Sequence, residues 1–319
     1  MRAVRLNAIR TPLEDARLRE PDPGRGEIVV EIRAAGICHS DLHYRDDAGR
    51  ARPPLTPGHE VAGVISAVGP EAGGWMTGDR VAIHYLLENG EMIGKERDGG
   101  WAEAIVVPAG NAVGVPAEVA LDHAAVMMCS TATAWHALKL SELRPDESLG
   151  ILGFGGLGVS AAQLAALLGV RRIVAVDVIG SKLRVAERWG AMGVDARSGE
   201  LSRSLHGLDV VLDFAGDAPT TLCALRALGR GGRLVVVGIN LRSLEIDPYA
   251  DLLVPERRLI GSSDHTRDEL VELLELAREG RLDLSPAITR TVPLAAAVID
   301  DVLDDLRRGT HHFRTVIHP

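Results

Sequence analysis

The sequence predicts an α/β fold in two parts: a β-rich unit, followed by a doubly wound parallel sheet with helices on both faces. Up to about residue 130, short β-branched runs are separated by glycine and proline turns, which is typical of an all-β unit. Beyond it, apolar runs alternate with helix-length stretches, which is typical of a parallel sheet. The length of 319 residues is sufficient for two ordinary domains. We expect a packed join between the two parts, with a ligand cleft at that join.

The individual strands and helices follow from these runs in chain order. The β-branched runs of the first part predict strands at 28–32, 61–68, 80–83 and 104–107. The apolar runs of the second part predict parallel strands at 149–152, 172–176, 209–212 and 233–237, covered by helices at 158–168, 181–189 and 220–228. From residue 264 the chain forms a tail, in which we expect helices at 267–279 and 295–308 and a last strand at 313–317.

Composition and charge exclude several classes of function. A formal charge of −9 argues against nucleic acid as a partner, because binding phosphates needs a basic surface. Residues 1–30 are charged throughout, which argues against a signal peptide. The uncharged stretch 148–170 is interrupted by glycines, so it predicts a strand, a turn and a helix rather than a membrane span. Three cysteines are too few for a disulfide framework and predict reduced thiols in the cytoplasm.

A glycine motif lies between a predicted strand and a predicted helix. Residues 153–158 read GFGGLG, the G-x-G-x-x-G spacing of dinucleotide-binding turns. Gly153 permits the tight turn, Gly155 lets the backbone approach a pyrophosphate, and Gly158 lets the helix pack closely. Gly156 and Leu157 lie at the helix start, where free N–H groups and the helix dipole favour phosphate. The motif predicts a dinucleotide site, with a structural glycine turn as the alternative.

An acidic residue follows the motif at the distance that a dinucleotide site requires. Asp177 ends the next predicted strand, 19 positions after Gly158, and a carboxylate there accepts hydrogen bonds from both ribose hydroxyls. The same charge repels a 2′-phosphate, so the sequence favours NAD over NADP. Lys182 is a candidate for contact with the same ribose, and a solvated lysine at a helix start is the alternative.

Candidate metal ligands stand in the β-rich part. Residues 36–43 read GICHSDLH and residues 58–63 read GHEVAG. A catalytic zinc site needs three protein ligands and one open position, and Cys38, His59 and Cys129 are a possible Cys₂His set. Spacings of 21 and 70 residues do not show that the fold brings them together, and small buried cysteines are the alternative.

These segments also carry a family resemblance. The chain closely resembles the zinc-dependent alcohol dehydrogenases of the medium-chain dehydrogenase/reductase superfamily in five segments: GICHSDLH, GHEVAGVISAVG, GDRV, DGGWAEAIVVP, and GFGGLG with Asp177. The resemblance extends over nearly the whole chain. It implies a GroES-like catalytic domain at 1–130, a Rossmann NAD-binding domain at 131–263, and a C-terminal segment at 264–319 that returns to the catalytic domain.

For the metal site, the resemblance implies that Cys38, His59 and Cys129 bind a catalytic zinc. It implies that Glu60 lies beside the metal as an alternative ligand. Asp41 is implied as the partner that orients His59 through a hydrogen bond.

For the reaction, the resemblance implies reversible hydride transfer between an alcohol and an aldehyde or ketone through a zinc-bound alkoxide, with NAD as the cofactor. Ser40 matches the hydroxyl that takes the alcohol proton. His43 matches the base that passes this proton to solvent.

Four further positions are carried over from the family. His39 matches a position near the cofactor pyrophosphate, and Arg314 resembles a C-terminal arginine that reaches the same group. Thr133 resembles the residue that packs on the nicotinamide. Tyr85 falls where the family lines its substrate pocket.

The chain departs from the family in one segment. Many members bind a second, structural zinc through four closely spaced cysteines, whereas residues 83–100 contain none. We therefore expect one catalytic zinc per subunit and no structural zinc. That lobe contributes to substrate access and assembly in relatives, so the particular alcohol, aldehyde or ketone and the choice between a homodimer and a homotetramer stay open.

Two other functions are weighed against an alcohol dehydrogenase. A zinc-independent enone or quinone reductase of the same superfamily would typically lack the zinc-ligand set, which is present here. A non-catalytic binding protein on the same fold would have lost Ser40, His43 or a zinc ligand, and none is lost. The third cysteine, Cys223, has apolar neighbours in a predicted helix and is expected in the core.

Overall fold

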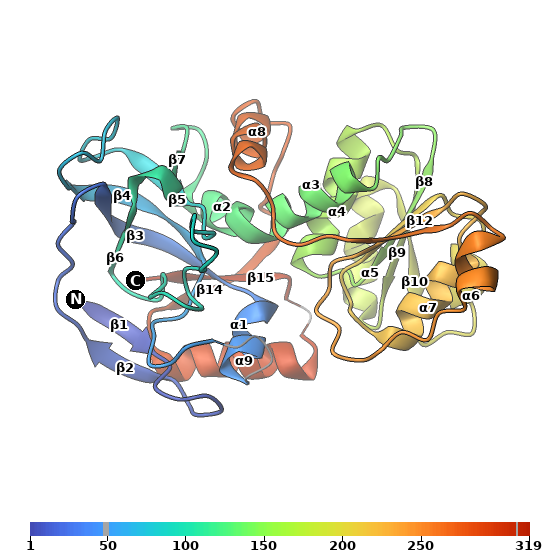
Figure 1. Ribbon diagram of the computed structural model, residues 1–319, viewed down its shortest axis with the longest axis horizontal. Coiled ribbons are helices and arrows are strands. Elements are labelled where there is room, and N and C mark those ends of the chain that lie inside the picture. The colour runs from blue at the N-terminus through green and yellow to red at the C-terminus, as the bar shows by residue number, and fades with distance from the viewer. Residues whose placement is uncertain (47–50, 311) are drawn as a thin grey trace. The chain divides into compact units, whose positions relative to one another are not determined.

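The computed structural model describes residues 1–46, 51–310 and 312–319. The chain divides into two compact units: Met1–Ser130 with Arg267–Pro319 forms unit 1, and Thr131–Thr266 forms unit 2. Figure 1 shows that strands dominate unit 1, whereas unit 2 is a sheet with helices packed beside it. In the part of the chain that the structure describes, no helix has the length and apolar character needed to cross a membrane.

Unit 1 is built on a mixed sheet whose described strands lie in the order β14, β15, β3, β4, β5, β7, with β6 also paired to β3. The strands are β3 Glu27–Ile37, β4 Glu60–Val68, β5 Arg80–Ile83, β6 Ala104–Pro108, β7 Ala112–Gly114, β14 Ile288–Pro293 and β15 Arg314–His318. A separate antiparallel pair joins β1 Arg2–Arg5 to β2 Glu14–Arg17. Because β15 pairs antiparallel with β3, strands from the first and last parts of the chain belong to one sheet.

Helices cover this sheet and connect its strands. They are α1 His39–Arg45, the 3-10 turn η1 Ala109–Asn111, α2 Leu121–Val126, α8 Arg267–Arg278 and α9 Ala296–Arg308; the π-helical turn η2 Met127–Thr131 follows α2. On α9, the residues Ile299, Val302 and Leu303 recur at helical spacing and join the main apolar cluster. The helix is therefore held to the unit by one apolar face.

The register of β3 and β4 decides where the candidate metal ligands lie. Gly36, near the end of β3, stands opposite Glu60, the first residue of β4. Cys38 follows β3 and His59 precedes β4, so this register brings both to the same end of the sheet. A Cβ at Gly36 would lie 1.9 Å from Glu60 Oε2, so only glycine leaves room for the glutamate side chain.

The core of unit 1 supports these strand ends. Val30, Ile65 and Ile83 come from three neighbouring strands and are almost completely buried, together with Trp101. Burying an aliphatic side chain of this size stabilises a fold by about 1.5–3 kcal/mol. The ends of β3 and β4, where the candidate ligands lie, are therefore supported by a well-packed apolar core.

Unit 2 is a parallel sheet whose described strands lie in the order β10, β9, β8, β11, β12, β13. Counted along the chain this is the 3-2-1-4-5-6 order of Rossmann folds, which bind ligands beyond the carboxyl ends of the strands. The strands are β8 Ser148–Leu152, β9 Arg172–Asp177, β10 Ala191–Asp195, β11 Val210–Asp213, β12 Arg233–Val236 and β13 Arg258–Gly261. The helices are α3 Ala132–Leu140, α4 Gly156–Leu167, α5 Gly180–Ala186, α6 Leu201–Leu205 and α7 Ala218–Ala227, with the 3-10 turn η3 Glu187–Trp189 and the π-helical turn η4 Pro248–Leu253.

The predicted α/β fold class is confirmed, and each predicted strand and helix overlaps an observed element. The strands that were not predicted are the pair β1 and β2, the sheet edges β7 and β14 in unit 1, and the sheet edges β10 and β13 in unit 2. The short helices α1, α2, α3 and α6 were also missed. Edge strands are half exposed and lack the continuous apolar run on which the prediction depended.

Candidate active site

Four potential metal ligands converge at the end of the sheet in unit 1. Cys38, His59, Glu60 and Cys129, which we call the ligand cluster, each offer one ligand atom, and these atoms all lie within 4.8 Å of one another. The Sγ atoms of Cys38 and Cys129 are 3.9 Å apart, and His59 Nε2 is 3.4 Å from Cys129 Sγ. All four residues are buried. The fold thus joins residues that sequence spacing alone could not join.

Local backbone structure places each member of the cluster. Cys38 stands between β3 and α1 with an extended backbone (φ −107°, ψ 156°), and His59 directly precedes β4. Cys129 lies in the π-helical turn η2. Single π-helical turns interrupt the regular α-helical spacing and are frequent at functional sites.

Asp41 is a buried carboxylate that contacts two of these residues. Its Oδ1 lies 3.2 Å from His59 Nδ1, and its Oδ2 accepts a 2.7 Å hydrogen bond from the backbone N–H of Cys38. With Nδ1 held by the carboxylate, Nε2 of His59 faces Cys129, which is the arrangement of a metal-binding imidazole. Burial alone would lower the pKa of His59, but the charge and hydrogen bond of Asp41 outweigh burial and raise it.

Two tyrosines pack against the ring of His59. Tyr85 makes an edge contact with 5.2 Å between ring centroids and 79° between planes, and Tyr44 makes one at 6.2 Å and 63°. Tyr85 is only 2% exposed. The structure therefore places this tyrosine, predicted to line the substrate pocket, against a candidate zinc ligand.

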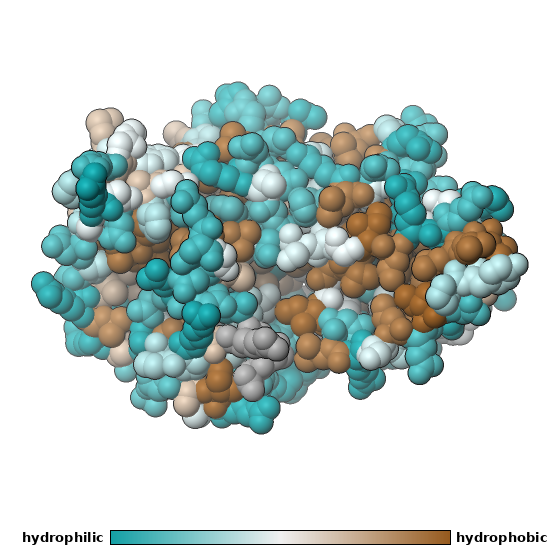
Figure 2. Space-filling model, viewed as in Figure 1, coloured by the Kyte–Doolittle hydropathy of each residue, from teal (hydrophilic) through white to brown (hydrophobic). Residues whose placement is uncertain are grey.

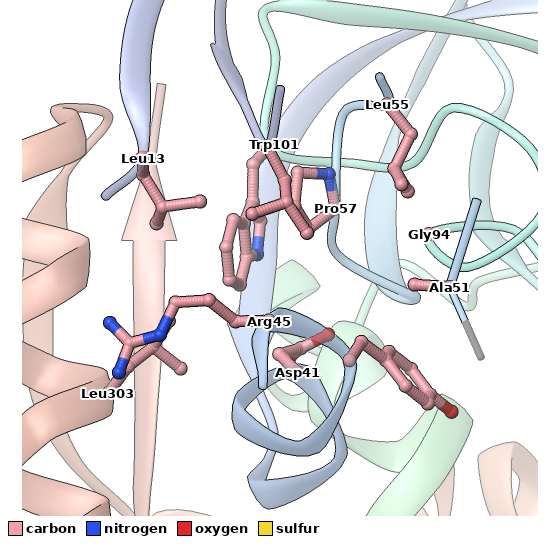
Figure 3. A pocket seen from close by; sticks show the side chains of 11 residues that line it. Leu13, Asp41, Arg45, Ala51, Leu55, Pro57, Gly94, Trp101 and Leu303 are labelled. Carbon is pink, nitrogen blue, oxygen red and sulfur yellow. The ribbon is translucent and has the colours of Figure 1, made fainter. Parts of the chain in front are cut away.

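A glycine and a tryptophan fix the chain just before His59. Gly58 has φ +94°, and a Cβ there would lie 2.4 Å from Trp101 Cδ1. Trp101 donates hydrogen bonds from Nε1 to the carbonyl of Gly36 and from its backbone N–H to the carbonyl of Pro57. Figure 3 shows Trp101 and Pro57 around the same small, mainly apolar hollow that Asp41 also lines. No sequence pattern marks Trp101 as part of the site.

Glu60 and Arg314 form a buried ion pair within the site. Arg314 Nη1 lies 3.1 Å from Glu60 Oε1, and the two side chains are 4% and 0% exposed. Among the described residues, no hydrogen bond of good geometry reaches either carboxylate oxygen of Glu60. Burial raises the pKa of Glu60 to about 7, against the opposing charge of Arg314. A buried carboxylate in this state is a group that a further cation would stabilise.

The donor atoms and their spacing fit a zinc ion. Zinc binds thiolate at about 2.3 Å and imidazole at about 2.0–2.1 Å. In a tetrahedral site with these bonds, two sulfurs are about 3.8 Å apart, and sulfur and nitrogen are about 3.5 Å apart. The observed distances are close to these values: 3.9 Å between the Sγ atoms of Cys38 and Cys129, and 3.4 Å between His59 Nε2 and Cys129 Sγ. Three such ligands leave one position open, and Glu60 is a fourth donor beside it.

The two thiols differ in acidity. The hydrogen bond with Cys129 lowers the pKa of Cys38, and the charges of Arg314 and His59 act in the same direction. The same contact raises the pKa of Cys129. The protein alone thus favours one thiolate, and metal binding favours both because the thiolate is the ligand form.

The residues predicted for proton transfer lie on α1, next to Cys38. Ser40 Oγ is 3.5 Å from Cys38 Sγ. His43 is half-buried, and its ring centroid lies 5.2 Å from that of the exposed His39. Ser40 and His43 are three positions apart on a helix and share a face. No hydrogen bond joins their side chains among the described residues.

The lobe without cysteines is held by a carboxylate. Glu91 accepts hydrogen bonds from Arg97 Nε at 2.7 Å and from Arg52 Nη1 at 3.3 Å. The contact with Arg97 lowers the pKa of Glu91. The buried Ile93 donates its backbone N–H to the carbonyl of Tyr85 at 3.0 Å, which ties the lobe to the tyrosine beside His59.

In unit 2, the glycine motif forms the turn between β8 and α4. Gly153 has φ +84°, and a Cβ at Gly158 would lie 2.5 Å from the Gly153 carbonyl oxygen. A Cβ at Gly155 would meet nothing within 4 Å, so the backbone borders open space there. No side chain caps α4, which starts at Gly156 and continues with Leu157. The first N–H groups of the helix and the open space together fit a pyrophosphate.

Asp177 ends β9 and reaches the glycine turn. Its Oδ2 accepts a 2.8 Å hydrogen bond from the backbone N–H of Phe154, and its Oδ1 accepts one of 2.9 Å from Ile179. Each carboxylate oxygen can accept a further hydrogen bond from a ribose hydroxyl. Burial lowers the pKa of Lys182, and the charge of Asp177 acts in the opposite direction. Thr133 is a buried residue of α3 in the same unit.

One buried carboxylate of unit 2 was missed from the sequence. Asp213 ends β11; its Oδ1 accepts hydrogen bonds from the N–H groups of Ala215 at 3.0 Å and Gly216 at 3.1 Å, and its Oδ2 accepts one from the Thr221 hydroxyl. Burial raises the pKa of Asp213. A Cβ at Gly153 would lie 3.0 Å from the nitrogen of Ala215, so Asp213 fixes a loop against the glycine turn. The sequence signal that could have identified Asp213 is an acidic residue at the end of an apolar run.

The strand order of unit 2 and the ligands gathered in unit 1 define a class: dehydrogenases that carry a Rossmann unit and a β-rich, metal-binding unit in one chain. Comparison with known proteins gives the family. Residues 24–117 match the alcohol dehydrogenase GroES-like domain, and residues 156–279 match the zinc-binding dehydrogenase domain. The chain belongs to the zinc-binding alcohol dehydrogenase family of the medium-chain dehydrogenases/reductases.

Individual relatives match over almost their full length. An alcohol dehydrogenase of Geobacillus stearothermophilus is 32% identical over 341 residues, covering 99% of each chain. An NAD-dependent alcohol dehydrogenase of Sulfolobus acidocaldarius is 31% identical, again covering 99% of each chain. The crystal structure of the alcohol dehydrogenase of Aeropyrum pernix has a TM-score of 0.90 at 30% identity and covers 100% of both chains.

Proposed function

We propose that this protein is a zinc- and NAD-dependent alcohol dehydrogenase, which transfers a hydride reversibly between an alcohol and an aldehyde or ketone. The observation that supports this most strongly is the buried set of Cys38, His59 and Cys129, whose ligand atoms have the spacing of a zinc site. Family membership supports the reaction class.

Cys38, His59 and Cys129 would hold one zinc ion per chain, with Glu60 as an alternative ligand. Asp41 keeps the imidazole of His59 in the orientation that presents Nε2. Zinc in such a site is a Lewis acid that lowers the pKa of an alcohol. The protein's own contribution is a dry, rigid set of donors with one position left open.

Proton transfer is assigned to Ser40 and His43 on α1. The hydroxyl of Ser40 lies 3.5 Å from Cys38 Sγ, at the border of the ligand cluster, so it can take the proton of a substrate hydroxyl bound there as it releases its own proton toward His43. His43, one helical turn further and half-buried, passes this proton to solvent. Imidazole suits this step because it accepts and releases protons near neutral pH.

NAD supplies the hydride acceptor. The start of α4 fits the pyrophosphate, with Gly156 and Leu157 contributing N–H groups. Asp177 fits the ribose hydroxyls and disfavours the 2′-phosphate of NADP. His39 and Arg314 are assigned to the pyrophosphate as cations, and Thr133 to the nicotinamide.

Metal analysis and chelation test this proposal. Purified protein is expected to contain one zinc per chain and to reduce NAD with primary, secondary, aromatic or polyol alcohols, followed by NADH absorbance. Removing zinc with a strong chelator should abolish this activity, and adding zinc should restore it. Alcohol oxidation that survives complete zinc removal would exclude the zinc-dependent mechanism, and two tightly bound zinc ions per chain would contradict the single site.

We also propose that the protein forms a homodimer or homotetramer. We place it in the cytoplasm, where thiolate ligands stay reduced. β13 is the edge of the unit 2 sheet, and most of its residues are exposed. Figure 2 shows apolar side chains gathered over the segment around η4, and the exposed apolar residues of this region are Ile239, Leu241, Tyr249, Leu253, Val254 and Leu259. An open strand edge beside exposed apolar side chains fits a contact with a second copy of the chain.

A further inference from the structure

A carboxylate and a guanidinium stand beside Asp177 on the neighbouring strand. β10 pairs in parallel with β9, and its last residue, Asp195, is the register partner of Asp177. Arg197 follows two residues later and donates hydrogen bonds to the two oxygens of Asp195 at 3.1 Å and 3.0 Å. The same guanidinium donates to the carbonyl of Val178 at 2.6 Å. It therefore lies against the residue that directly follows the candidate ribose ligand.

The position of this guanidinium is set locally. The backbone N–H of Arg197 also donates to Asp195 at 2.9 Å, so the carboxylate holds both the backbone and the side chain of the arginine. The side chain of Arg197 is 68% exposed, and that of Asp195 is 42% exposed. Exposed ion pairs contribute little to stability, so the pair is not needed to hold the sheet together.

The proposed NAD site would bring the 2′-carbon of the cofactor to the same edge of the sheet. Adjacent parallel strands are about 4.8 Å apart and end at the same edge of the sheet. Asp177 is assigned to the ribose hydroxyls at that edge, and a 2′-phosphate would replace one of these hydroxyls. A guanidinium is the side chain that best matches phosphate geometry, because it donates two parallel hydrogen bonds. Arg197 is thus a suitable phosphate ligand that is already engaged by Asp195.

We propose that Asp195 is a specificity-determining residue, which occupies Arg197 and withholds it from the 2′-phosphate of NADP. The preference for NAD then depends on two carboxylates with different roles. Asp177 repels the 2′-phosphate directly, and Asp195 neutralises the neighbouring cation that would bind it. This inference rests on the proposed NAD site and deepens it.

Dissociation constants measured by titration calorimetry on the zinc-loaded protein test the proposal. The ligands are NAD and NADP, together with 5′-AMP and adenosine 2′,5′-bisphosphate, which differ only by the 2′-phosphate. Asp177→Ser should strengthen NADP binding by about tenfold, because it removes the direct repulsion. Adding Asp195→Asn should strengthen it by about a further fivefold, because the freed guanidinium gains a charge-assisted hydrogen bond. Adding Arg197→Gln should remove this second gain.

The matched control is Glu200→Gln, which removes the same charge from an exposed ion pair with Arg203 in the same unit. In the Asp177→Ser background it should change NADP affinity less than about twofold, because screening weakens distant charges. In the otherwise unchanged protein, Asp195→Asn should leave NAD affinity within about twofold, which also shows that the variant folds. Asp195→Ser serves as a second replacement with the same expectation.

Two outcomes overturn the assignment of Asp195. One is an NADP affinity in the Asp177→Ser background that does not respond to Asp195→Asn or Asp195→Ser. The other is a gain that persists after Arg197→Gln. A protein that binds neither NAD nor NADP contradicts the proposed function as well, whereas normal NAD binding without the predicted response contradicts this inference alone.

Discussion

Asp41, Trp101 and Tyr85 show how much of the site depends on side chains that support the candidate ligands. Asp41 contacts both Cys38 and His59, Trp101 packs against the glycine before His59, and Tyr85 packs on the imidazole ring. Such supporting groups orient a ligand and fix its tautomer, so their loss weakens metal binding even when every ligand remains.

Replacing Asp41 tests this role directly. Asp41→Asn should lower zinc affinity by about 10–100-fold, because a neutral amide no longer stabilises the orientation and charge of a ligating imidazole. Competition with a chromogenic chelator measures the affinity. Glu103→Gln removes an exposed carboxylate that pairs with Arg2 in the same unit and should leave zinc affinity unchanged. An Asp41→Asn protein with normal zinc affinity contradicts the role assigned to this residue.

Among the elements, β8 and β12 are linked by a buried ion pair. Glu147 directly precedes β8, and Arg233 is the first residue of β12. Glu147 Oε2 lies 2.6 Å from Arg233 Nη2, and the side chains are 6% and 7% exposed. Burial would raise the pKa of Glu147, but hydrogen bonds from Arg233 and from the backbone of Arg144 outweigh burial and lower it.

Glu147→Gln should destabilise the protein at pH 7 by about 3 kcal/mol, because it leaves the buried guanidinium of Arg233 without its partner charge. The pKa of Glu147 is lower in the folded state than the unfolded value of about 4.3, so the carboxylate stabilises the fold above that pH. This stabilisation is lost as the pH falls through the folded-state pKa. The difference in unfolding free energy between the wild type and Glu147→Gln should therefore become smaller below about pH 4.

Urea unfolding at pH 7 and at acidic pH measures this difference. Glu142→Gln is the control, because Glu142 forms an exposed pair with Arg258 in the same unit and should change stability by less than about 1 kcal/mol. If the difference in unfolding free energy between wild type and Glu147→Gln stays constant with pH, the ion pair does not cause that difference.

The prediction of elements from sequence succeeded or failed for one physical reason. The central strands of unit 2, β8, β9, β11 and β12, are covered on both faces and appear as continuous apolar runs. The edges β10 and β13 do not: β10 contains Gly193 and the exposed Met192, and β13 is mostly exposed. Their pairing is decided by the strand beside them, which no local pattern reports.

For the whole molecule, the exposed apolar residues near η4 and β13 predict self-association. Leu253→Arg with Leu259→Arg should convert the assembly to smaller species, because both apolar side chains are exposed there and buried charge is costly in an interface. Sedimentation velocity measures the change. Met76→Arg places the same charge on an exposed apolar position of unit 1 and should leave the assembly intact. A wild-type protein that is monomeric at micromolar concentration contradicts the proposed oligomer.

Local sequence patterns are sufficient to predict the two-part α/β class, the central strands and the glycine turn with Asp177. These signals are local, because apolar runs, glycine spacing and a strand-end carboxylate are all contained in one continuous stretch of chain. Residue types and family resemblance also named the candidate zinc ligands.

The convergence of Cys38, His59 and Cys129 is visible only in the folded chain, because 21 and 70 residues separate them along the sequence. Their meeting depends on the register of β3 against β4 and on the π-helical turn that holds Cys129. The ion pair of Glu60 with Arg314 and the position of Arg197 beside Val178 likewise depend on strands paired across the fold. Contacts between distant segments are properties of packing and register, which a sequence pattern does not contain.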